Sequence, residues 1–394
     1  MTDPITPPPA ERARLLVVDD IEMNRDLLVR RARRLGHDSG VAEDGVAALA
    51  QLRAAPWDLV LLDITMPRMD GYETLRHIKT DPALAHIPVI MVSAIDETDS
   101  VVRCLELGAD DYVSKPFNAT ILQARIEASL AKKRLADQKR ATLQALAREL
   151  EIGQRIQRGF LPDALPALPG WHFAAHCEPA RQVGGDFYDA LVLPDGRVAF
   201  VLADVCDKGV GAALYMALFR TLLRALLSQT AAGAPADEAL VKVLGFVNDY
   251  IAQEHGRDNM FATLVAGVLQ PQDGVLHWTN LGHDAPMLLR AGGALDTLAP
   301  QGVACGMMPG LRPTVLRDQL APGDALLMFT DGVTEGLGAA GRFGDERLLA
   351  FMQAGAGKDA QTLVSDLVDA LAGHCDGFAA HDDVTLMAIT RDAR

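Results

Sequence analysis

In the N-terminal half of this chain, two apolar runs end in aspartates. Residues Leu15–Val18 are followed by Asp19 and Asp20, and the run Leu59–Leu62 is followed by Asp63. Apolar runs of this length, bounded by polar residues, predict buried strands. Carboxylates at the ends of neighbouring strands meet at one edge of a sheet, where they repel one another unless a divalent cation neutralises them.

The same pattern occurs in the C-terminal half. Apolar runs that begin at Val198 and Leu326 end in Asp204 and Asp331. The sequence therefore predicts two sites for hard cations, one in each half. A length of 394 residues is too great for one ordinary core, so two domains are expected.

Composition disfavours several classes of partner. Lys and Arg total 37 against 52 Asp and Glu, and the net charge of -15 argues against nucleic acid and anionic membranes. Residues 1–11 are proline-rich, lack the apolar segment of a signal peptide, and are predicted to be a disordered tail. No apolar run approaches the roughly 20 residues that span a bilayer, so no membrane insertion is expected. Five scattered cysteines fit a reducing compartment, which predicts a cytoplasmic protein.

Residues 12–130 alternate between apolar runs and helical stretches. Besides the two runs above, strands are predicted at Val89–Val92 and Tyr112–Val113, with a weak one near Val41. This alternation is typical of a doubly wound α/β domain with a five-stranded parallel sheet.

A long helix is predicted between the two halves. Residues 118–160 contain no proline and are rich in strong helix formers. Leu143, Leu146 and Leu150 follow the spacing of a coiled coil, which fails further along. The linker 131–161 is therefore predicted to be either a plain spacer helix or a coiled coil that joins two chains in a homodimer.

Residues 162–394 combine short strands, joined by turn signals, with longer helical stretches. This combination indicates an α+β domain built as a β-sandwich flanked by helices. The helices are predicted at Gly211–Ser228, Asp237–Gln253, Glu346–Gln353 and Gln361–Leu371.

The chemistry of the first acidic site follows from its residue types. Asp19 and Asp20 would hold Mg²⁺, which prefers oxygen ligands. Asp63 is then free to attack phosphorus as a carboxylate nucleophile. Lys115, which follows the last strand, would neutralise phosphoryl oxygens together with Mg²⁺, and Ser93 would donate a hydrogen bond to the phosphate.

This half resembles the receiver domain of two-component response regulators. The resemblance implies that Asp63 accepts a phosphoryl group from a sensor histidine kinase and that the carbonyl of Thr65 completes the Mg²⁺ site. It also implies that Tyr112 rotates inward when Ser93 engages phosphate, and that the peptide bond before Pro116 is cis. The matching motifs are Asp19–Asp20, Leu62–Gly71, Ser93–Ala94 and Lys115–Phe117.

The second acidic site contains more carboxylates than the first. A pair of Mg²⁺ or Mn²⁺ ions needs several such ligands, and a metal pair can hydrolyse a phosphomonoester without a catalytic Cys or Ser. The candidate residues are Asp186, Asp189, Asp204, Asp331, Asp382 and Asp383.

This half resembles the metal-dependent PPM-type serine/threonine phosphatases, within them the bacterial branch that controls sigma factors. The resemblance implies that Asp204 bridges two metals, that the Val205 carbonyl binds one of them, and that Asp186 supports the first. Asp331 and the pair Asp382–Asp383 would supply ligands to the second. Matching stretches include Glu149–Pro162, Gly184–Asp189, Ala203–Val205, Lys208–Gly209, Met260–Thr263, Gly282–His283, Phe329–Glu335 and Asp382–Thr385.

One departure from this pattern is Cys206–Asp207, where the family commonly has Ser-Gly. A catalytic thiol at Cys206 is disfavoured because the sequence shows no base for it. Lys208 and His283 are candidate phosphate contacts, with structural roles as the alternative.

By these resemblances the chain is a response regulator in which phosphorylation of Asp63 controls a metal-dependent serine/threonine phosphatase. The substrate implied is a phosphorylated anti-sigma-factor antagonist with a STAS-type fold, acting in a partner-switching pathway. The alternative is a non-enzymatic adaptor that binds a regulatory protein through a phosphatase-like domain, and the complete carboxylate set disfavours it. A DNA-binding output is disfavoured because the C-terminal half lacks a basic recognition helix.

Overall fold

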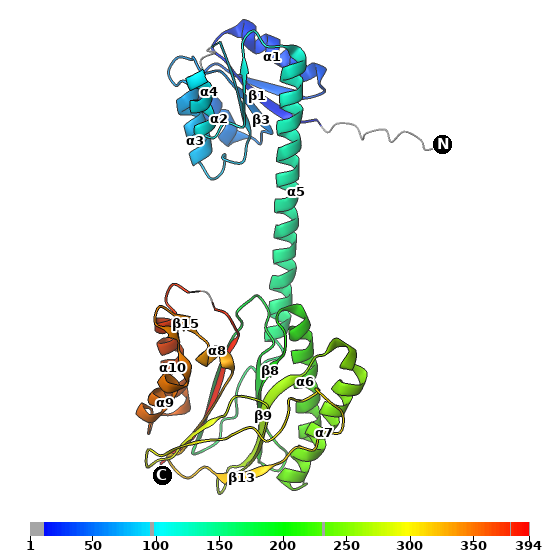
Figure 1. The fold of residues 1–394 in the computed structure, drawn as a ribbon, viewed down its shortest axis with the longest axis vertical. Coiled ribbons are helices and arrows are strands. Elements are labelled where there is room, and N and C mark those ends of the chain that lie inside the picture. The colour runs from blue at the N-terminus through cyan, green and yellow to red at the C-terminus, as the bar shows by residue number, and fades with distance from the viewer. Residues whose placement is uncertain (1–11, 95–97, 231–232, 379, 394) are drawn as a thin grey trace, which may run out of the picture. The chain divides into compact units, whose positions relative to one another are not determined.

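The computed structural model describes residues 12–94, 98–230, 233–378 and 380–393, so the tail predicted at residues 1–11 lies outside the described residues. The chain divides into two compact units, residues 1–146 and 147–394. The division falls inside the segment that the sequence predicts as a linker. Each unit is described by itself (Figure 1).

The first unit contains a parallel sheet of five strands in the order β2-β1-β3-β4-β5. The central strands are buried along their whole length, which explains why they appear in the sequence as continuous apolar runs. This confirms the predicted doubly wound sheet. The strands are β1 (Arg14–Val18), β2 (Asp38–Ala42), β3 (Leu59–Leu62), β4 (Val89–Ser93) and β5 (Asp111–Ser114).

Helices cover both faces of this sheet. Leu28 of α1 (Glu22–Arg34) and Ile126 of α5 (Ala119–Arg158) share one apolar core with the sheet. The other core, on the opposite face, takes side chains from three helices: α2 (Gly45–Ala54), α3 (Gly71–Thr80) and α4 (Thr98–Glu106).

Helix α5 is the long helix that the sequence predicts, and it runs without interruption from the first unit into the second. Its buried residues lie near its start and end at Leu130. Beyond that point, Leu135, Leu143 and Leu146 are exposed to 70%, 56% and 52%. Of the leucines in the predicted coiled-coil spacing, Leu143 and Leu146 are therefore exposed among the described residues, and Leu150 is half-buried.

The second unit is built on two five-stranded sheets. In the first, the order is β13-β10-β9-β8-β7, and in the second it is β12-β11-β14-β17-β6. Every strand pair in these two sheets is antiparallel. The strands are β6 (Trp171–Glu178), β7 (Phe187–Val192), β8 (Val198–Val205), β9 (Ala262–Gln270), β10 (Val275–Leu281), β11 (Met287–Leu289), β12 (Leu295–Thr297), β13 (Leu316–Gln319), β14 (Ala325–Phe329) and β17 (Val384–Arg391).

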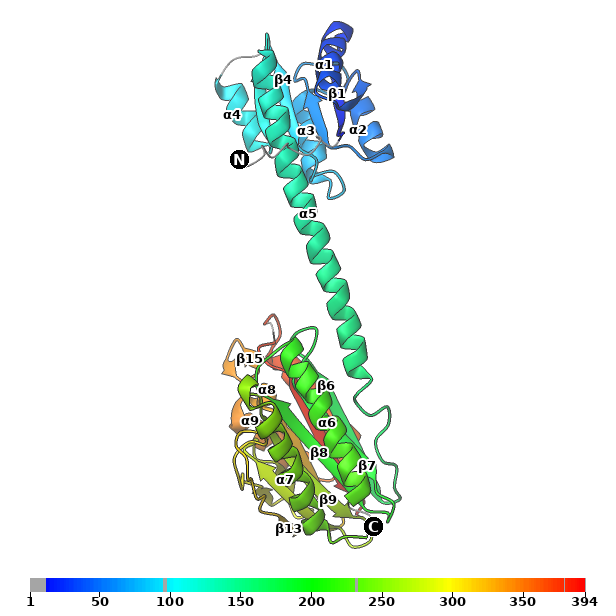
Figure 2. The same ribbon diagram turned by 90° about the vertical axis from the view of Figure 1, so that its right-hand side faces the viewer.

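The two sheets pack face to face around a core that contains Phe200 and Trp278 from one sheet and Met328 from the other. Helices α6 (Val210–Thr230) and α7 (Ala236–Glu254) pack on the outer face of the first sheet. Helices α9 (Gly344–Ala354) and α10 (Ala360–His374) pack on the outer face of the second, as Figures 1 and 2 show. The predicted helix-flanked sandwich is confirmed. Short elements complete the unit: η1 (Gly256–Asp258), α8 (Asp331–Thr334), β15 (Leu337–Gly338) and β16 (Gly341–Arg342).

The prediction that no apolar run is long enough to span a membrane needs one correction. Helix α6 has 21 residues, and an 18-residue window within it has a mean hydropathy of 1.5, so by length and composition alone it would suffice. In this structure Met216, Phe219 and Leu223 pack in the core beneath it. Its composition is therefore accounted for by its position against the sheet.

The sandwich core depends on one close approach between strands. Gly267 of β9 lies opposite Phe200 of β8, and a methyl group at position 267 would overlap the phenyl ring. We expect Gly267→Ala to lower the free energy of unfolding of the second unit by about 1–3 kcal/mol, because a packed core has no room for the extra carbon. Urea denaturation measures this. The control is Gly373→Ala in α10, where nothing lies within 4 Å and the same change should be neutral or stabilising. Equal destabilisation by both changes would contradict this account.

Candidate metal and phosphoryl-transfer sites

The three aspartates predicted for the first site lie together at one edge of the parallel sheet. Asp19 and Asp20 follow β1, and Asp63 follows β3, which pairs with β1 in parallel register. Carboxylate oxygens of the three residues lie within 4.8 Å of one another. Asp19 and Asp63 are buried, whereas Asp20 is exposed. Three converging oxygen ligands suit a hard cation such as Mg²⁺.

Lys115 joins this cluster from the segment after β5. Its Nζ lies 2.7 Å from Oδ2 of Asp19 and 3.0 Å from Oδ1 of Asp63. Burial raises the pKa of Asp63 above its ordinary value, although the Lys115 cation opposes this shift. The peptide bond between Lys115 and Pro116 is cis, as the resemblance implied. The lysine therefore holds the carboxylate of Asp63, the predicted phospho-acceptor, in place beside Asp19.

The remaining predicted residues of this site lie around the same edge. Ser93 is buried at the end of β4, next to β5 in the sheet. Tyr112 lies on β5, where its half-buried side chain packs against the apolar core. Thr65 is exposed two residues after Asp63. The structure thus brings the acceptor and its predicted neighbours to one edge, while the individual roles of Ser93, Tyr112 and Thr65 stay predictions.

The second acidic site begins with a pair of carboxyl groups, of which Asp186 is buried and Asp204 is half-buried. Asp186 directly precedes β7 and Asp204 lies near the end of β8, and a side-chain hydrogen bond joins the two. Burial, and then the charge of Asp331, raise the pKa of Asp204 to about 7. Burial, and then the charge of Asp204, raise the pKa of Asp186 well above its ordinary value. Thr330 fixes this pair by donating a hydrogen bond of 2.8 Å from its hydroxyl to Oδ2 of Asp186.

A second group of carboxylates contains Asp331, Glu335 and Asp382, with one oxygen of each within 4.8 Å of the others. Burial, and then the charge of Asp382, raise the pKa of Asp331 to about 6. Glu335 was not among the residues predicted for the site. Its place at the end of the Phe329–Glu335 motif was the available signal, because one turn of helix brings position 335 beside position 331.

These carboxylates fit a divalent metal. Their raised pKa values reflect burial and mutual repulsion, which bound cations would relieve. Asp186, Asp204, Asp331 and Asp382 are the residues that would hold the ions, and the carbonyl of Val205 belongs to the same strand end.

Asp383 has a different role from the predicted ligand role. Its Oδ1 accepts a hydrogen bond of 2.8 Å from the amide of Ala180, and its Oδ2 accepts one of 2.7 Å from the amide of Gly185. Gly184 allows this contact, because a side chain at that position would overlap the Asp383 carboxylate. Asp383 therefore anchors the loop that carries Asp186, and we interpret it as a positioning residue.

Asp189, which was also predicted as part of the acidic site, pairs with arginines. It is 1% exposed, and its carboxylate lies 3.2 Å from Nε of Arg220 and 2.5 Å from Nη1 of Arg224. Both arginines belong to α6. Because these charges already compensate Asp189, it links strand β7 to the helix above the sheet.

The two candidate phosphate contacts lie in different environments. Lys208 is partly exposed at the site, where its Nζ lies 2.7 Å from Oδ2 of Asp382. His283 is 3% exposed; its Nε2 donates to the carbonyl of Phe329 at 3.0 Å and its Nδ1 accepts from Thr263 at 2.8 Å. These contacts favour the structural alternative for His283, whereas Lys208 keeps its place beside the predicted ligands.

Cys206 is half-buried beside Asp204. Its Sγ accepts a hydrogen bond of 3.2 Å from the amide of Phe261, and burial raises the pKa of the thiol. The thiol is therefore held in its neutral form, consistent with the absence of a base for it in the sequence.

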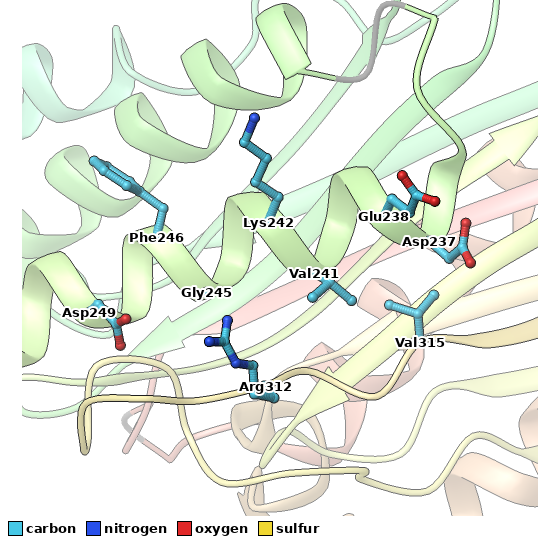
Figure 3. A pocket seen from close by; sticks show the side chains of 9 residues that line it. All are labelled: Asp237, Glu238, Val241, Lys242, Gly245, Phe246, Asp249, Arg312 and Val315. Atoms are coloured by element: carbon cyan, nitrogen blue, oxygen red, sulfur yellow. The ribbon is translucent and has the colours of Figure 1, made fainter.

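A separate hollow of about 550 Å³ lies along α7 (Figure 3). Figure 3 shows Arg312 extending from a facing segment toward α7 beside Gly245. None of the clustered carboxylates described above lines it. Its lining residues are Asp237, Glu238, Val241, Lys242, Gly245, Phe246, Asp249, Arg312 and Val315.

Neutralising the carboxylate of Asp331 should change Mn²⁺ affinity and the free energy of unfolding in opposite directions. We expect Asp331→Asn to weaken Mn²⁺ binding to the second unit at least tenfold, which is about 1.4 kcal/mol. In metal-free buffer the same change should raise the free energy of unfolding, because it removes one repelling charge. Calorimetric titration and urea denaturation measure the two effects. The control, Asp296→Asn on β12, makes the same change outside the cluster and should leave Mn²⁺ binding intact. Unchanged Mn²⁺ affinity in Asp331→Asn would contradict this assignment.

The buried imidazole of His283 predicts a pH effect on stability. Burial lowers its pKa to about 4, against about 6.5 in the unfolded chain. The unfolded state therefore binds more protons between these values, and stability is lost as pH falls through that window. This residue alone accounts for about 3 kcal/mol between pH 6.5 and 4. NMR titration should find His283 neutral at pH 5.5, and titration near 6.5 would refute the assignment.

Comparison with known proteins connects both sites to families. The model of the response regulator receiver domain matches residues 15–127, and that of stage II sporulation protein E (SpoIIE) matches residues 194–392. Protein IcfG from Synechocystis sp. is 40% identical over 265 residues, which cover 62% of this chain and 42% of that protein. The sensory transduction protein RegX3 from Mycobacterium tuberculosis is 46% identical over 117 residues, which cover 29% of this chain and 50% of that protein.

Among solved structures, the SiaA-PP2C domain of Pseudomonas aeruginosa matches with a TM-score of 0.55 and 22% identity, over 64% of this chain and 99% of that domain. This likeness concerns the fold. The chain spans no more than half the length of IcfG and of RegX3. Since the SpoIIE model covers about half of the chain, the chain belongs to the SpoIIE family and joins a response regulator receiver domain to a phosphatase domain of the PP2C fold.

Proposed function

We propose that this chain is a response regulator in which phosphorylation of Asp63 controls a metal-dependent protein serine/threonine phosphatase. The observation that carries the proposal is the convergence of Asp186, Asp204, Asp331 and Asp382. They come from segments that are distant in the sequence, yet their charges raise one another's pKa values. Repulsion among these buried and half-buried carboxylates is costly, and metal binding offers a physical reason for it.

The phosphatase residues would divide the work between binding and positioning. Asp204 and Asp331 belong to the two groups of ligands, and when bound, Mg²⁺ or Mn²⁺ would activate water and polarise the phosphoryl group. Thr330 and Asp383 hold the Asp186 side of the site in place. Lys208 lies beside Asp382, where its cation is available to the phosphate of a substrate. In the reaction an oxygen of water forms a bond to phosphorus, the bond to the serine or threonine oxygen breaks, and that oxygen takes up a proton.

The receiver residues support phosphoryl transfer from a sensor histidine kinase. An oxygen of Asp63 would form the new bond to phosphorus, while the bond from phosphorus to the kinase histidine breaks and the histidine nitrogen keeps the electron pair. Lys115, already 3.0 Å from Asp63, would neutralise the transferred group. Asp19 and Asp20 would hold the Mg²⁺ that this chemistry requires.

The end of α5 offers a route by which the receiver would act on the phosphatase. Gln157 lies in the last turn of this helix, and its side-chain amide donates to the carbonyl of Gly184 at 2.5 Å and accepts from the amide of Gly184 at 3.1 Å. Gly184 belongs to the loop that Asp383 anchors and that carries Asp186. Movement of the helix would therefore directly shift the loop that carries Asp186, a predicted metal-binding residue.

The partners follow from family membership and from the charge of the chain. The proposed substrate is a phosphorylated anti-sigma-factor antagonist of the STAS type, in a cytoplasmic partner-switching pathway. The exposed leucines of α5 support a homodimer through the linker helix, because Leu143 and Leu146 lie three residues apart on its surface.

The test is Mn²⁺-dependent hydrolysis of an aryl phosphate and of a phosphorylated STAS protein, with and without beryllofluoride as a phosphoryl mimic at Asp63. We expect Asp204→Asn to lower kcat by at least a hundredfold, because a buried ligand is lost. The mimic should change the wild-type rate, and Asp63→Asn should abolish that response while the phosphatase residues stay intact. Turnover in neither condition, together with retained binding of the STAS protein, would instead support a non-enzymatic adaptor.

The same assay also tests the contact between Gln157 and Gly184. Gln157→Ala removes both hydrogen bonds to Gly184, so we expect the response to the mimic to fall while Asp63 still becomes phosphorylated. Gln154→Ala, one turn earlier on the same helix, is the control. An unchanged response in Gln157→Ala would exclude this route.

A further inference from the structure

A second hollow opens directly beside the phosphatase carboxylates. It has a volume of about 280 Å³ and shares Glu335 and Asp382 with the second group of carboxylates, and Gly332, which follows Asp331, also lines it. Its other walls come from the end of β6, the turn after α8 and the last turns of α10. A protein segment that presents a phosphorylated side chain to these carboxylates would therefore have this hollow beside it.

The lining of this hollow, apart from the shared acidic edge, is largely apolar. Leu337, Val368, Leu371 and Ala372 contribute aliphatic groups, and Phe378 stands at the rim with 46% of its surface exposed. A large aromatic side chain left this exposed beside a functional site is typical of a binding surface.

One wall of the hollow forms where the turn after α8 lies close against α10. Gly336 follows α8, and a Cβ atom there would lie 2.6 Å from Cδ1 of Leu371 and 3.1 Å from Sγ of Cys375. The turn after α8 therefore rests directly on α10. The same turn contains Glu335, so the apolar hollow and the acidic group are parts of one continuous surface.

The charges around the rim restrict what this hollow accepts. Glu178 is exposed and lies 3.4 Å from the imidazole of His176, and Glu335 is paired with Arg342 at 2.8 Å. An acidic side chain would meet these carboxylates and would also lose its hydration on an apolar floor. An uncharged apolar side chain meets neither penalty.

We propose that this hollow is a substrate subsite that receives one aliphatic or aromatic side chain of the phosphoprotein, one to three residues from the phosphorylated serine or threonine. The spacing follows from the shared residues, because an extended chain advances roughly 3.3 Å per residue. The subsite rests on the proposed phosphatase function and defines the class of substrate that the site selects: a phosphorylated segment with a nearby apolar residue.

The test uses synthetic phosphoserine peptides with an alanine and glycine background. A single leucine is moved from three residues before the phosphoserine to three residues after it, and kcat/KM is compared with that of the peptide without leucine. We expect one position to raise kcat/KM about tenfold to a hundredfold, which is the usual discrimination by an apolar pocket. Glutamate at that position should lower kcat/KM below the alanine value.

Variants of the rim identify the hollow as the source of this preference. Phe378→Ala removes the aromatic rim, and Ala372→Trp fills the hollow. In both variants the ratio of kcat/KM between the leucine peptide and the alanine peptide should fall toward one. Phe246→Ala removes an exposed phenylalanine from the separate hollow on α7 (Figure 3) and should keep the wild-type ratio. Phe378 and Phe246 are both exposed, so the pair controls for loss of an aromatic side chain from the surface.

Hydrolysis of an aryl phosphate, measured in parallel, separates the two proposals. Metal-dependent hydrolysis of the aryl phosphate with a leucine ratio of one at every position would overturn the subsite alone. A preference that survives in both Phe378→Ala and Ala372→Trp would also overturn it. Turnover of neither the aryl phosphate nor any peptide would overturn the phosphatase function and the subsite with it.

Discussion

Carboxylates buried close together repel one another, and both units of this chain hold such groups where strands end. In the receiver, the Lys115 cation compensates Asp19 and Asp63. In the second unit, Thr330 donates a hydrogen bond to Asp186, while burial and then the neighbouring acids raise the pKa values of Asp186 and Asp204. The fold must supply the free energy that keeps these groups together, and the sandwich core does so.

The residues around the second acidic site hold its mutually repelling carboxylates in place. Asp383 accepts two backbone amides, Thr330 donates its hydroxyl to Asp186, and Gly184 and Gly332 leave space for Asp383 to approach. These contacts orient the ligands without adding positive charge to the site. The repulsion among the acids therefore stays in place, and under the proposed function bound ions would relieve it, with an affinity that depends on the position of the loop.

The loop that contains Gly184 also contacts the last turn of α5. Gln157 contacts Gly184, so the same short segment meets the helix on one side and carries Asp186 on the other. A regulatory signal therefore need not cross the sandwich core to alter the site. The hollow beside Glu335, which we propose as a substrate subsite, lies on another edge of the site, so regulation and selection would act on different parts of one surface.

The sequence by itself determined the strands, the long helix and the aspartates that end the strands. These features are local, because an apolar run predicts a buried strand wherever it lies, and the residue that ends it reaches the sheet edge. Only the tertiary structure decided which acids face one another. Asp189 faces two arginines of α6, Asp383 faces backbone amides of a segment about 200 residues away, and Glu335 joins Asp382. No local pattern encodes such contacts, since they depend on how distant segments pack together.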